Sequence, residues 1–189
     1  MELVLIRHGL PERRGDTADP PLTPEGRDQA GRVARHLANE RIDAVFASTM
    51  IRAVQTAEPF AQWGGHDIQQ REGIVEFDRG TGAYMPMEEL KRDDYEAWKA
   101  FVSGGYQMDI NAFQRDVVET LEEVVKTNPG KRVAVFCHGG VINVWTAHVL
   151  GMAPRLFFEP VYASIHRFLC ASSGERNLVS LNERAHLRD

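Results

Sequence analysis

Residues 2–9 read ELVLIRHG, and this stretch decides the fold. The apolar run from residue 3 to residue 6 has no polar alternation, which is typical of a strand buried on both faces of a parallel sheet. Arg7, His8 and Gly9 follow the run at once. A guanidinium and an imidazole beside a buried strand are costly unless they have a partner or a ligand. We therefore predict a buried strand whose carboxyl end carries a functional site.

A second strand is predicted at residues 43–47, where another apolar run gives way to polar residues. Ser48 or Thr49 follows it, and either hydroxyl residue could cap a helix that runs to about residue 62. Arg52 falls near the start of that helix. This junction places a guanidinium beside free helical N–H groups, which suits an anion.

The strongest strand signal is residues 132–137, which read RVAVFC. His138, Gly139 and Gly140 come next and open a helix predicted to reach about residue 150. Glycines let the backbone approach a ligand closely, and a helix N-terminus offers N–H donors to an anion. A third strand-to-helix junction therefore carries groups that favour anion binding.

Other strands and helices alternate along the chain. A helix begins at Pro24 with Thr23 as its cap, a short strand covers residues 68–70, and two C-terminal strands cover residues 162–171 and 177–181. The fold class expected is α/β, a three-layer α/β/α sandwich whose mostly parallel sheet ends in a C-terminal antiparallel strand pair. Ligands of such folds bind beyond the carboxyl ends of the strands, so the three junctions should converge.

Residues 78–109 combine many aromatic and Met side chains with many charges. Leu90, Trp98, Phe101 and Val102 can share one face of a helix, so at least one helix is expected here. We predict that residues 1–189 form a single domain and that a helical cap insertion at about residues 78–110 packs on it and roofs the pocket.

Bulk composition narrows the classes of function. The chain has 189 residues and a formal net charge of −5, which argues against nucleic-acid or membrane-surface binding. The two cysteines, Cys137 and Cys170, lie in apolar stretches and indicate reduced thiols of a cytoplasmic protein. No signal peptide or membrane span is visible. The five histidines outside the junctions have no ligand spacing, so no metal is expected. A homo-oligomer is left open.

The three junctions together suit a phosphoryl dianion. Arg7 and Arg52 supply guanidinium forks that match phosphate oxygens. A neutral imidazole can also attack phosphorus, so one of His8 and His138 could be a nucleophile while the other, if protonated, offsets charge on the phosphoryl oxygens. The leaving oxygen then needs a proton, so an acid should lie beside the pocket.

Four segments resemble the histidine phosphatase superfamily, the phosphoglycerate-mutase-like proteins. They are LIRHG at residues 5–9, DPPLTPEG at residues 19–26 with Gln29 and Ala30 after it, STMIRAVQTA at residues 48–57 and CHGGVI at residues 137–142. Each is a weak signal alone, but all four occur in the family's order and span most of the chain. The resemblance implies a phosphatase without metal or organic cofactor, acting on a small phosphorylated substrate.

The resemblance also implies roles for single residues. His8 would be the nucleophile, and Arg7, Arg52 and His138 would bind the phosphoryl group together with His8 and Gly139. Glu76 looks like the family's proton donor. The family's usual residues after it are replaced by Thr81, Gly82 and Ala83, so Asp78 remains a competitor for the acid.

A second departure follows the first motif, where residues 10–14 read LPERR. The family's phosphate-binding Thr and Asn are missing there, and Arg13 or Arg14 could replace them. The function expected is a metal-independent phosphomonoester hydrolase that works through a phosphohistidine on His8. Two alternatives stay open: a phosphoglycerate mutase-type phosphoryl transfer, and a non-catalytic phosphoryl-binding or interaction protein on the same fold. The physiological substrate cannot be read from the sequence.

Overall fold

A six-stranded sheet forms the centre of the structure, a computed structural model that describes residues 1–14, 17–80, 84, 86–106 and 108–188. The strand order is β3-β2-β4-β1-β5-β6. The strands are β1 (Glu2–Arg7), β2 (Ala44–Ser48), β3 (Ile68–Arg71), β4 (Arg132–Cys137), β5 (Ile165–Cys170) and β6 (Arg176–Glu183). Strands β1 to β4 run parallel to one another, whereas β5 is antiparallel to both β1 and β6. The predicted sheet is confirmed.

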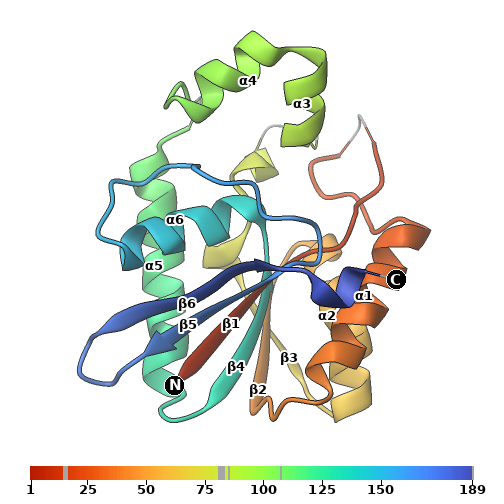
Figure 1. The fold of residues 1–189 in the computed structure, drawn as a ribbon, viewed down its shortest axis with the longest axis vertical. Coiled ribbons are helices and arrows are strands. Elements are labelled where there is room, and N and C mark those ends of the chain that lie inside the picture. The colour runs from red at the N-terminus through yellow and green to blue at the C-terminus, as the bar shows by residue number, and fades with distance from the viewer. Residues whose placement is uncertain (15–16, 81–83, 85, 107, 189) are drawn as a thin grey trace.

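Helices cover both faces of this sheet (Figure 1). One face packs against α1 (Pro24–Leu37) and α2 (Ile51–Gly64), and the other packs against α5 (Ile110–Thr127) and α6 (Gly139–Val149). Successive side chains of a strand point to opposite faces. In β1, Leu3 and Leu5 accordingly join the core beneath α5 and α6, and Val4 and Ile6 join the core beneath α1 and α2. The unbroken apolar run of β1 therefore reflects burial on both faces, as predicted.

The start of α1 agrees with the sequence, because the Thr23 side chain accepts a hydrogen bond from the Gly26 N–H at 2.9 Å. The predicted cap of α2 is wrong. Met50 occupies the cap position and makes no side-chain capping bond. Ser48 is the last residue of β2, and its hydroxyl bonds to His138 as well as to the Met50 N–H. The Thr49 hydroxyl donates to Glu72. Neither hydroxyl is therefore available to α2.

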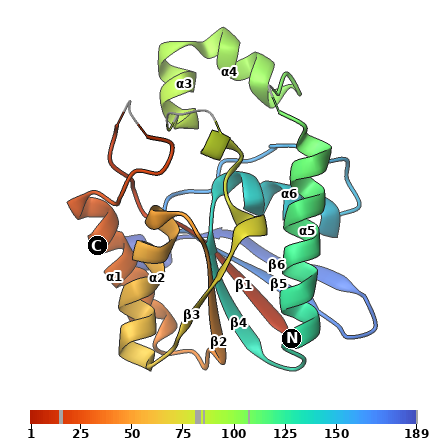
Figure 2. The same cartoon turned by 180° about the vertical axis from the view of Figure 1, so that it is seen from behind.

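The segment after β3 leads away from the sheet through two 3-10 turns, η1 (Glu72–Ile74) and η2 (Phe77–Gly80). It continues into α3 (Met87–Asp93) and α4 (Tyr95–Val102), which lie beyond the carboxyl ends of the parallel strands (Figures 1 and 2). Placing Leu90 and Trp98 on one helix was wrong. Asp94 separates the two helices, because its carboxylate caps α4 by accepting from the Ala97 N–H at 2.9 Å.

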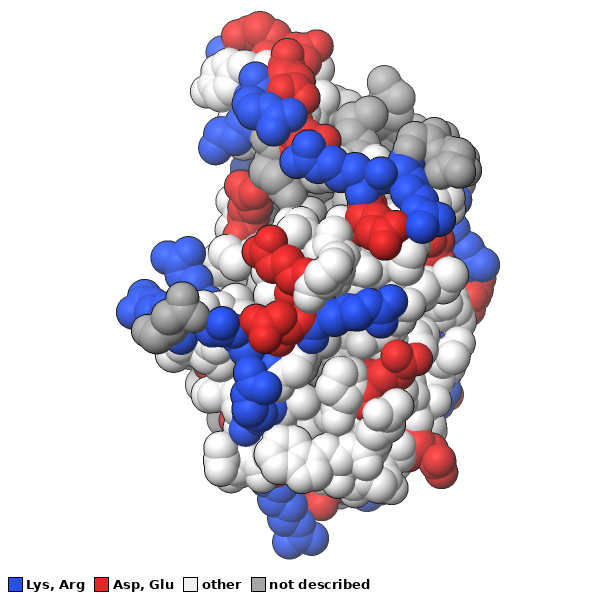
Figure 3. All heavy atoms as spheres, turned by 90° about the vertical axis from the view of Figure 1, so that its right-hand side faces the viewer, with Lys and Arg blue, Asp and Glu red and all other residues white. Residues whose placement is uncertain are grey.

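At the C-terminal end, β5 begins later than predicted because the chain turns at Ala163, where φ is 58°. The short 3-10 turn η3 (Ala185–Leu187) then returns the chain to α1 (Figure 1). Within the described ranges, no helix combines the length and the apolar composition needed to cross a bilayer. On the face seen in Figure 3, Lys and Arg side chains are interspersed with Asp and Glu side chains. The absence of nucleic-acid or membrane partners stays a prediction.

Candidate active site

The three strand-to-helix junctions meet at the carboxyl edge of the sheet. Arg7 and His8 end β1, Arg52 lies in the first turn of α2, and His138 lies between β4 and α6. The ring centroids of His8 and His138 are 5.2 Å apart. The convergence expected from the parallel sheet is therefore observed, although the segments lie far apart in the chain.

His8 is almost fully buried, and its Nδ1 lies 2.8 Å from the Gly9 carbonyl oxygen. A carbonyl oxygen can only accept, so Nδ1 carries the proton and Nε2 keeps its lone pair. Burial lowers the pKa of His8 well below its usual value, and the charges of Arg52 and Arg7 lower it further. His8 is therefore a neutral imidazole at neutral pH with an unprotonated Nε2.

The two arginines are held by different partners. The Arg7 guanidinium donates to the Pro160 carbonyl and lies 3.9 Å from the centre of the Tyr162 ring. The Arg52 side chain is fully buried, and its Nη2 donates to Asp78 Oδ1 at 3.1 Å. Asp78 lies beside the site, so this ion pair holds Arg52 at the site.

His138 is fully buried, and its Nε2 lies 2.9 Å from the Ser48 hydroxyl oxygen. Its Nδ1 and the Nε of Arg52 are buried and have no hydrogen-bond partner among the described residues. Burial lowers the pKa of His138, and the charge of Arg52 is the next largest cause. Both imidazoles are thus neutral in the ligand-free protein. A dianion bound beside them would favour protonation of His138.

Glu76 and Asp78 are both buried near the imidazoles, but their environments differ. Glu76 accepts hydrogen bonds from the Gly140 N–H at 2.9 Å and from the Phe77 N–H at 3.1 Å. Burial and the charge of Asp78 nevertheless raise the pKa of Glu76 to about 7. Burial also raises the pKa of Asp78, while the adjacent Arg52 opposes the rise. Of these two carboxyl groups, Asp78 forms an ion pair with Arg52, and Glu76 forms none with any described residue.

The contact between Glu76 and α6 explains the second glycine of the CHGG segment. A Cβ atom at Gly140 would lie 2.2 Å from Glu76 Oε1 and 2.7 Å from the Phe77 ring. A Cβ atom at Gly139 would meet nothing closer than 3.6 Å. Gly140 is therefore the glycine that the packing of Glu76 requires, whereas the sequence had suggested only Gly139 as a ligand-binding residue.

The loop that follows Gly9 does not supply the expected replacement ligands. Arg13 forms an ion pair with Glu89 of α3 at 2.5 Å, and Arg14 forms one with Glu12 at 2.8 Å. Both arginine side chains are largely exposed, and neither lines the cavity at the site. The suggestion that they replace the family's Thr and Asn is not supported. Residues 81–83, where the sequence also departs from the family pattern, lie outside the described residues.

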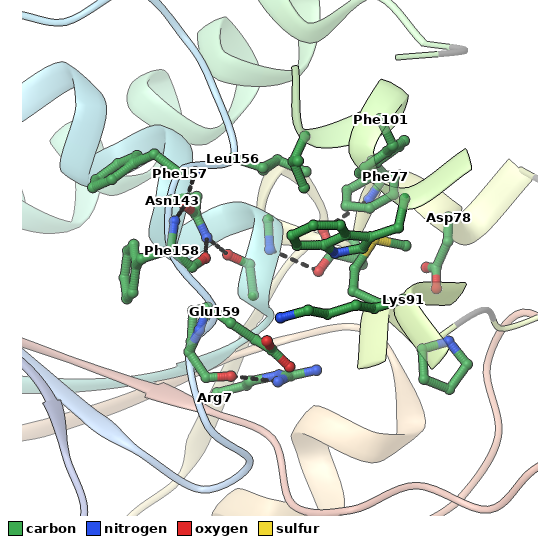
Figure 4. A pocket seen from close by; sticks show the side chains of 18 of the residues that line it. Arg7, Phe77, Asp78, Lys91, Phe101, Asn143, Leu156, Phe157, Phe158 and Glu159 are labelled. Atoms are coloured by element: carbon green, nitrogen blue, oxygen red, sulfur yellow. Dashed lines mark hydrogen bonds between the residues drawn. The ribbon is translucent and has the colours of Figure 1, made fainter. Parts of the chain in front are cut away.

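A cavity of about 430 Å³ opens beside these groups (Figure 4). Arg7, His8, Glu76 and Gly139 are among its lining residues, whereas Arg52 and His138 are not. Residues of α3 and α4 line the side away from the sheet. No cluster of three or more His, Cys, Asp or Glu side chains that could hold a metal ion occurs in the described part of the chain.

Asn143 was not anticipated from the sequence. Its side-chain oxygen accepts from the Phe157 N–H at 2.8 Å, and its amide nitrogen donates to the Gly139 carbonyl at 2.9 Å. It thus ties the loop after α6 to the start of that helix. The one available signal was an amide inside an otherwise apolar helical stretch, because a buried amide needs partners. No sequence signal pointed to Tyr84 or Tyr162, which flank the arginines.

Comparison with known proteins agrees with this geometry. The sequence model of the histidine phosphatase superfamily (branch 1) matches residues 3–184. Phosphoserine phosphatase 1 of Hydrogenobacter thermophilus is 27% identical over 99% of this chain and 94% of its own length. Phosphoglycerate mutase-like protein 4 of Arabidopsis thaliana is 29% identical over 75% of this chain and 68% of its own length.

Solved structures show the same likeness. A phosphoserine phosphatase of Entamoeba histolytica, crystallised with phosphoserine, superimposes with a TM-score of 0.80 at 28% identity and covers 99% of both chains. A mycobacterial glucosyl-3-phosphoglycerate phosphatase with inorganic phosphate has a TM-score of 0.82 at 20% identity, also over 99% of both chains, which speaks for the fold alone. These likenesses confirm the expected fold and the phosphatase class. The chain belongs to the histidine phosphatase superfamily, branch 1.

Proposed function

We propose that this protein hydrolyses phosphomonoesters through a phosphohistidine formed on His8. The proposal is carried by two buried nitrogen atoms beside a neutral His8, His138 Nδ1 and Arg52 Nε, which have no hydrogen-bond partner in the described part of the chain. Buried polar atoms are almost always hydrogen-bonded, so two orphans at one place indicate a ligand rich in acceptors. The dianionic oxygens of a phosphoryl group satisfy that requirement.

In the first step, the His8 Nε2 lone pair attacks phosphorus while the bond from phosphorus to the ester oxygen breaks. Arg7, Arg52 and His138 would hold the phosphoryl oxygens, and the backbone N–H of Gly139 would add a donor from the start of α6. Glu76 would give its proton to the departing ester oxygen, so the product is a neutral alcohol.

In the second step, the carboxylate of Glu76 takes a proton from water as the water oxygen attacks phosphorus. The P–N bond breaks, its electron pair returns to His8, and inorganic phosphate leaves. We assign the acid to Glu76 and not to Asp78, because a pKa of about 7 lets Glu76 donate in one step and accept in the next. We assign a positioning role to Asp78, because its ion pair with Arg52 holds that arginine in place.

The substrate is proposed to be a small phosphorylated molecule, in keeping with relatives named for phosphoserine. We propose a mechanism without metal, a single domain with residues 78–110 as its cap, and a location in the cytoplasm, where free buried thiols such as Cys137 persist. Whether the chain forms a homo-oligomer is left to measurement.

The test uses p-nitrophenyl phosphate with EDTA present. Wild-type protein should turn over, and acid-quenched protein should carry acid-labile phosphate. His8→Ala should lose both properties, and His148→Ala, which removes an exposed histidine of α6, should keep them. Turnover that requires a metal, or labelled phosphate that persists in His8→Ala, would contradict the proposal. Phosphoryl exchange between phosphoglycerates faster than hydrolysis would indicate the mutase alternative.

A further inference from the structure

We infer that the alcohol part of the substrate carries an aromatic ring or a similarly flat apolar group, and that Trp98 is the residue that selects it. This inference rests on the proposed phosphatase function, since it concerns the leaving-group side of the same cavity. It goes beyond that function because it names a substrate class that differs from small polar esters such as phosphoserine.

The first support is the composition of the cavity wall on the side away from the imidazoles. Helix α4 contributes Trp98, Phe101 and Val102 to this wall. The loop after α6 contributes Leu156, Phe157 and Phe158. In Figure 4, Arg7 lies on one side of the cavity, whereas Phe101 and Leu156 lie on the opposite side. A phosphoryl group held near Arg7 and His8 would therefore direct its ester group toward an apolar surface.

The second support is that the ring contacts of Trp98 among the described residues are confined to α3 and α4. Its ring contacts are with Tyr95 of the same helix, at 5.4 Å between centroids, and with the Lys91 ammonium of α3, at 4.6 Å. Phe101, in contrast, packs against Phe77 at 5.8 Å and therefore anchors the helix. Helix α4 fully buries none of its residues. Covering the half-buried indole with a flat apolar group would remove its remaining apolar surface from water.

The third support is that the polar side chains on this wall are either already bonded or exposed. The Asn143 side chain is bonded to the backbone of the loop after α6. The charged side chains that line the cavity there, Lys91, Arg155 and Glu159, are exposed. A serine-like leaving group would bring an ammonium and a carboxylate, and burying them against apolar side chains is unfavourable. A cavity of about 430 Å³ is also of the size that holds larger organic ligands.

The experiment compares two phosphate esters of primary alcohols, 2-(2-naphthyl)ethyl phosphate and ethyl phosphate. Both lose the same kind of alkoxide, so the need for a proton is matched and the apolar group is the difference between them. Wild-type protein should prefer the naphthyl ester in kcat/KM by at least about tenfold, because even one buried methylene can give that discrimination. Trp98→Ala should reduce the preference by about tenfold through loss of stacking and burial.

Two control variants, Trp63→Ala and Trp98→Phe, test whether the effect is specific to the aromatic face of Trp98. Trp63→Ala removes an exposed indole of α2 that does not line the cavity, and it should leave the preference unchanged. The ratio of the two kcat/KM values is measured in one preparation, so a partly unfolded variant still reports it. Trp98→Phe should retain most of the preference, since an aromatic face remains.

Each other outcome overturns a defined part of the reasoning. Equal kcat/KM for the two esters in wild type, or an unchanged ratio in Trp98→Ala, overturns the inference and leaves phosphatase activity standing. A higher kcat/KM for O-phosphoserine than for the naphthyl ester does the same. No turnover of any ester, p-nitrophenyl phosphate included, refutes the proposed function and the inference with it.

Discussion

Replacing Glu76 with glutamine should slow the hydrolysis of alkyl phosphates far more than that of p-nitrophenyl phosphate. In the structure, burial and the charge of Asp78 raise the pKa of Glu76 from 4.5 to about 7. A change of this size favours the protonated form by about 3 kcal/mol. Roughly half of the enzyme then holds the proton at pH 7, compared with about 0.3 per cent for an unperturbed carboxyl group.

A positioned general acid contributes about 10²–10⁴-fold to the rate. Glu76→Gln should therefore lower kcat for ethyl phosphate by about that factor. For p-nitrophenyl phosphate the loss should stay below about tenfold, because p-nitrophenolate departs without a proton. Glutamine has nearly the same size, but it can keep only one of the two acceptors that bind the Gly140 and Phe77 N–H groups.

The assay measures single-turnover formation of the phosphoenzyme with both substrates, for wild type, Glu76→Gln and Asp78→Asn. Thermal melts check that the variants fold. Asp78→Asn should slow both substrates because it disturbs Arg52. It also removes the charge that raises the pKa of Glu76, so at pH 7 the alkyl ester should lose more than p-nitrophenyl phosphate, but by less than about tenfold. An equal loss with both substrates in Glu76→Gln would refute the assignment of the acid. A selective loss of about 10²-fold or more in Asp78→Asn would give the role to Asp78.

Three other results are expected. In pH-rate profiles with alkyl phosphates, kcat/KM should fall as pH rises through about 7, because Glu76 loses its proton there, and a flat profile to pH 9 would contradict this. Gly140→Ala should lower kcat for alkyl phosphates at least about tenfold, because the new Cβ atom would displace the Glu76 carboxyl group. The control Gly31→Ala should change this kcat less than about twofold, because its Cβ atom would meet nothing closer than 3.7 Å. Arg52→Met should destabilise the fold by about 3–5 kcal/mol in urea titrations, because it removes the guanidinium that pairs with the buried Asp78 carboxylate. Adding Asp78→Asn should recover part of that loss, and no recovery would argue against the ion pair.

The layout of the sheet could be predicted because its signals are local. Burial on both faces is visible in the apolar runs of β1 and β4, and the Thr23-Pro24 start of α1 depends on neighbouring residues alone. Such patterns reflect backbone geometry and side-chain periodicity, which a short segment carries by itself. The convergence of the carboxyl ends of the strands then followed from general rules for parallel sheets, whereas the order of the strands was not predicted.

Predictions failed where distant residues compete for the same group. Ser48 looks like a helix cap in its own segment, but its hydroxyl bonds to His138, which lies between β4 and α6. Arg13 looked available for a phosphate, but Glu89 of α3 binds it. In each case a partner distant in sequence supplied the stronger interaction, and no pattern in the short segment reveals that partner.

By itself, the sequence determined the α/β class, the positions of its strands and the identity of the groups that gather at the edge of the sheet. Only the tertiary structure distinguished the two nearby carboxyl groups. Asp78 meets the guanidinium of Arg52, whereas Glu76 meets two backbone N–H groups and an apolar surround. The free energy of ionising a carboxyl group depends on the charges and water around it. Those surroundings exist only once α2, α6 and the segment after β3 have packed together.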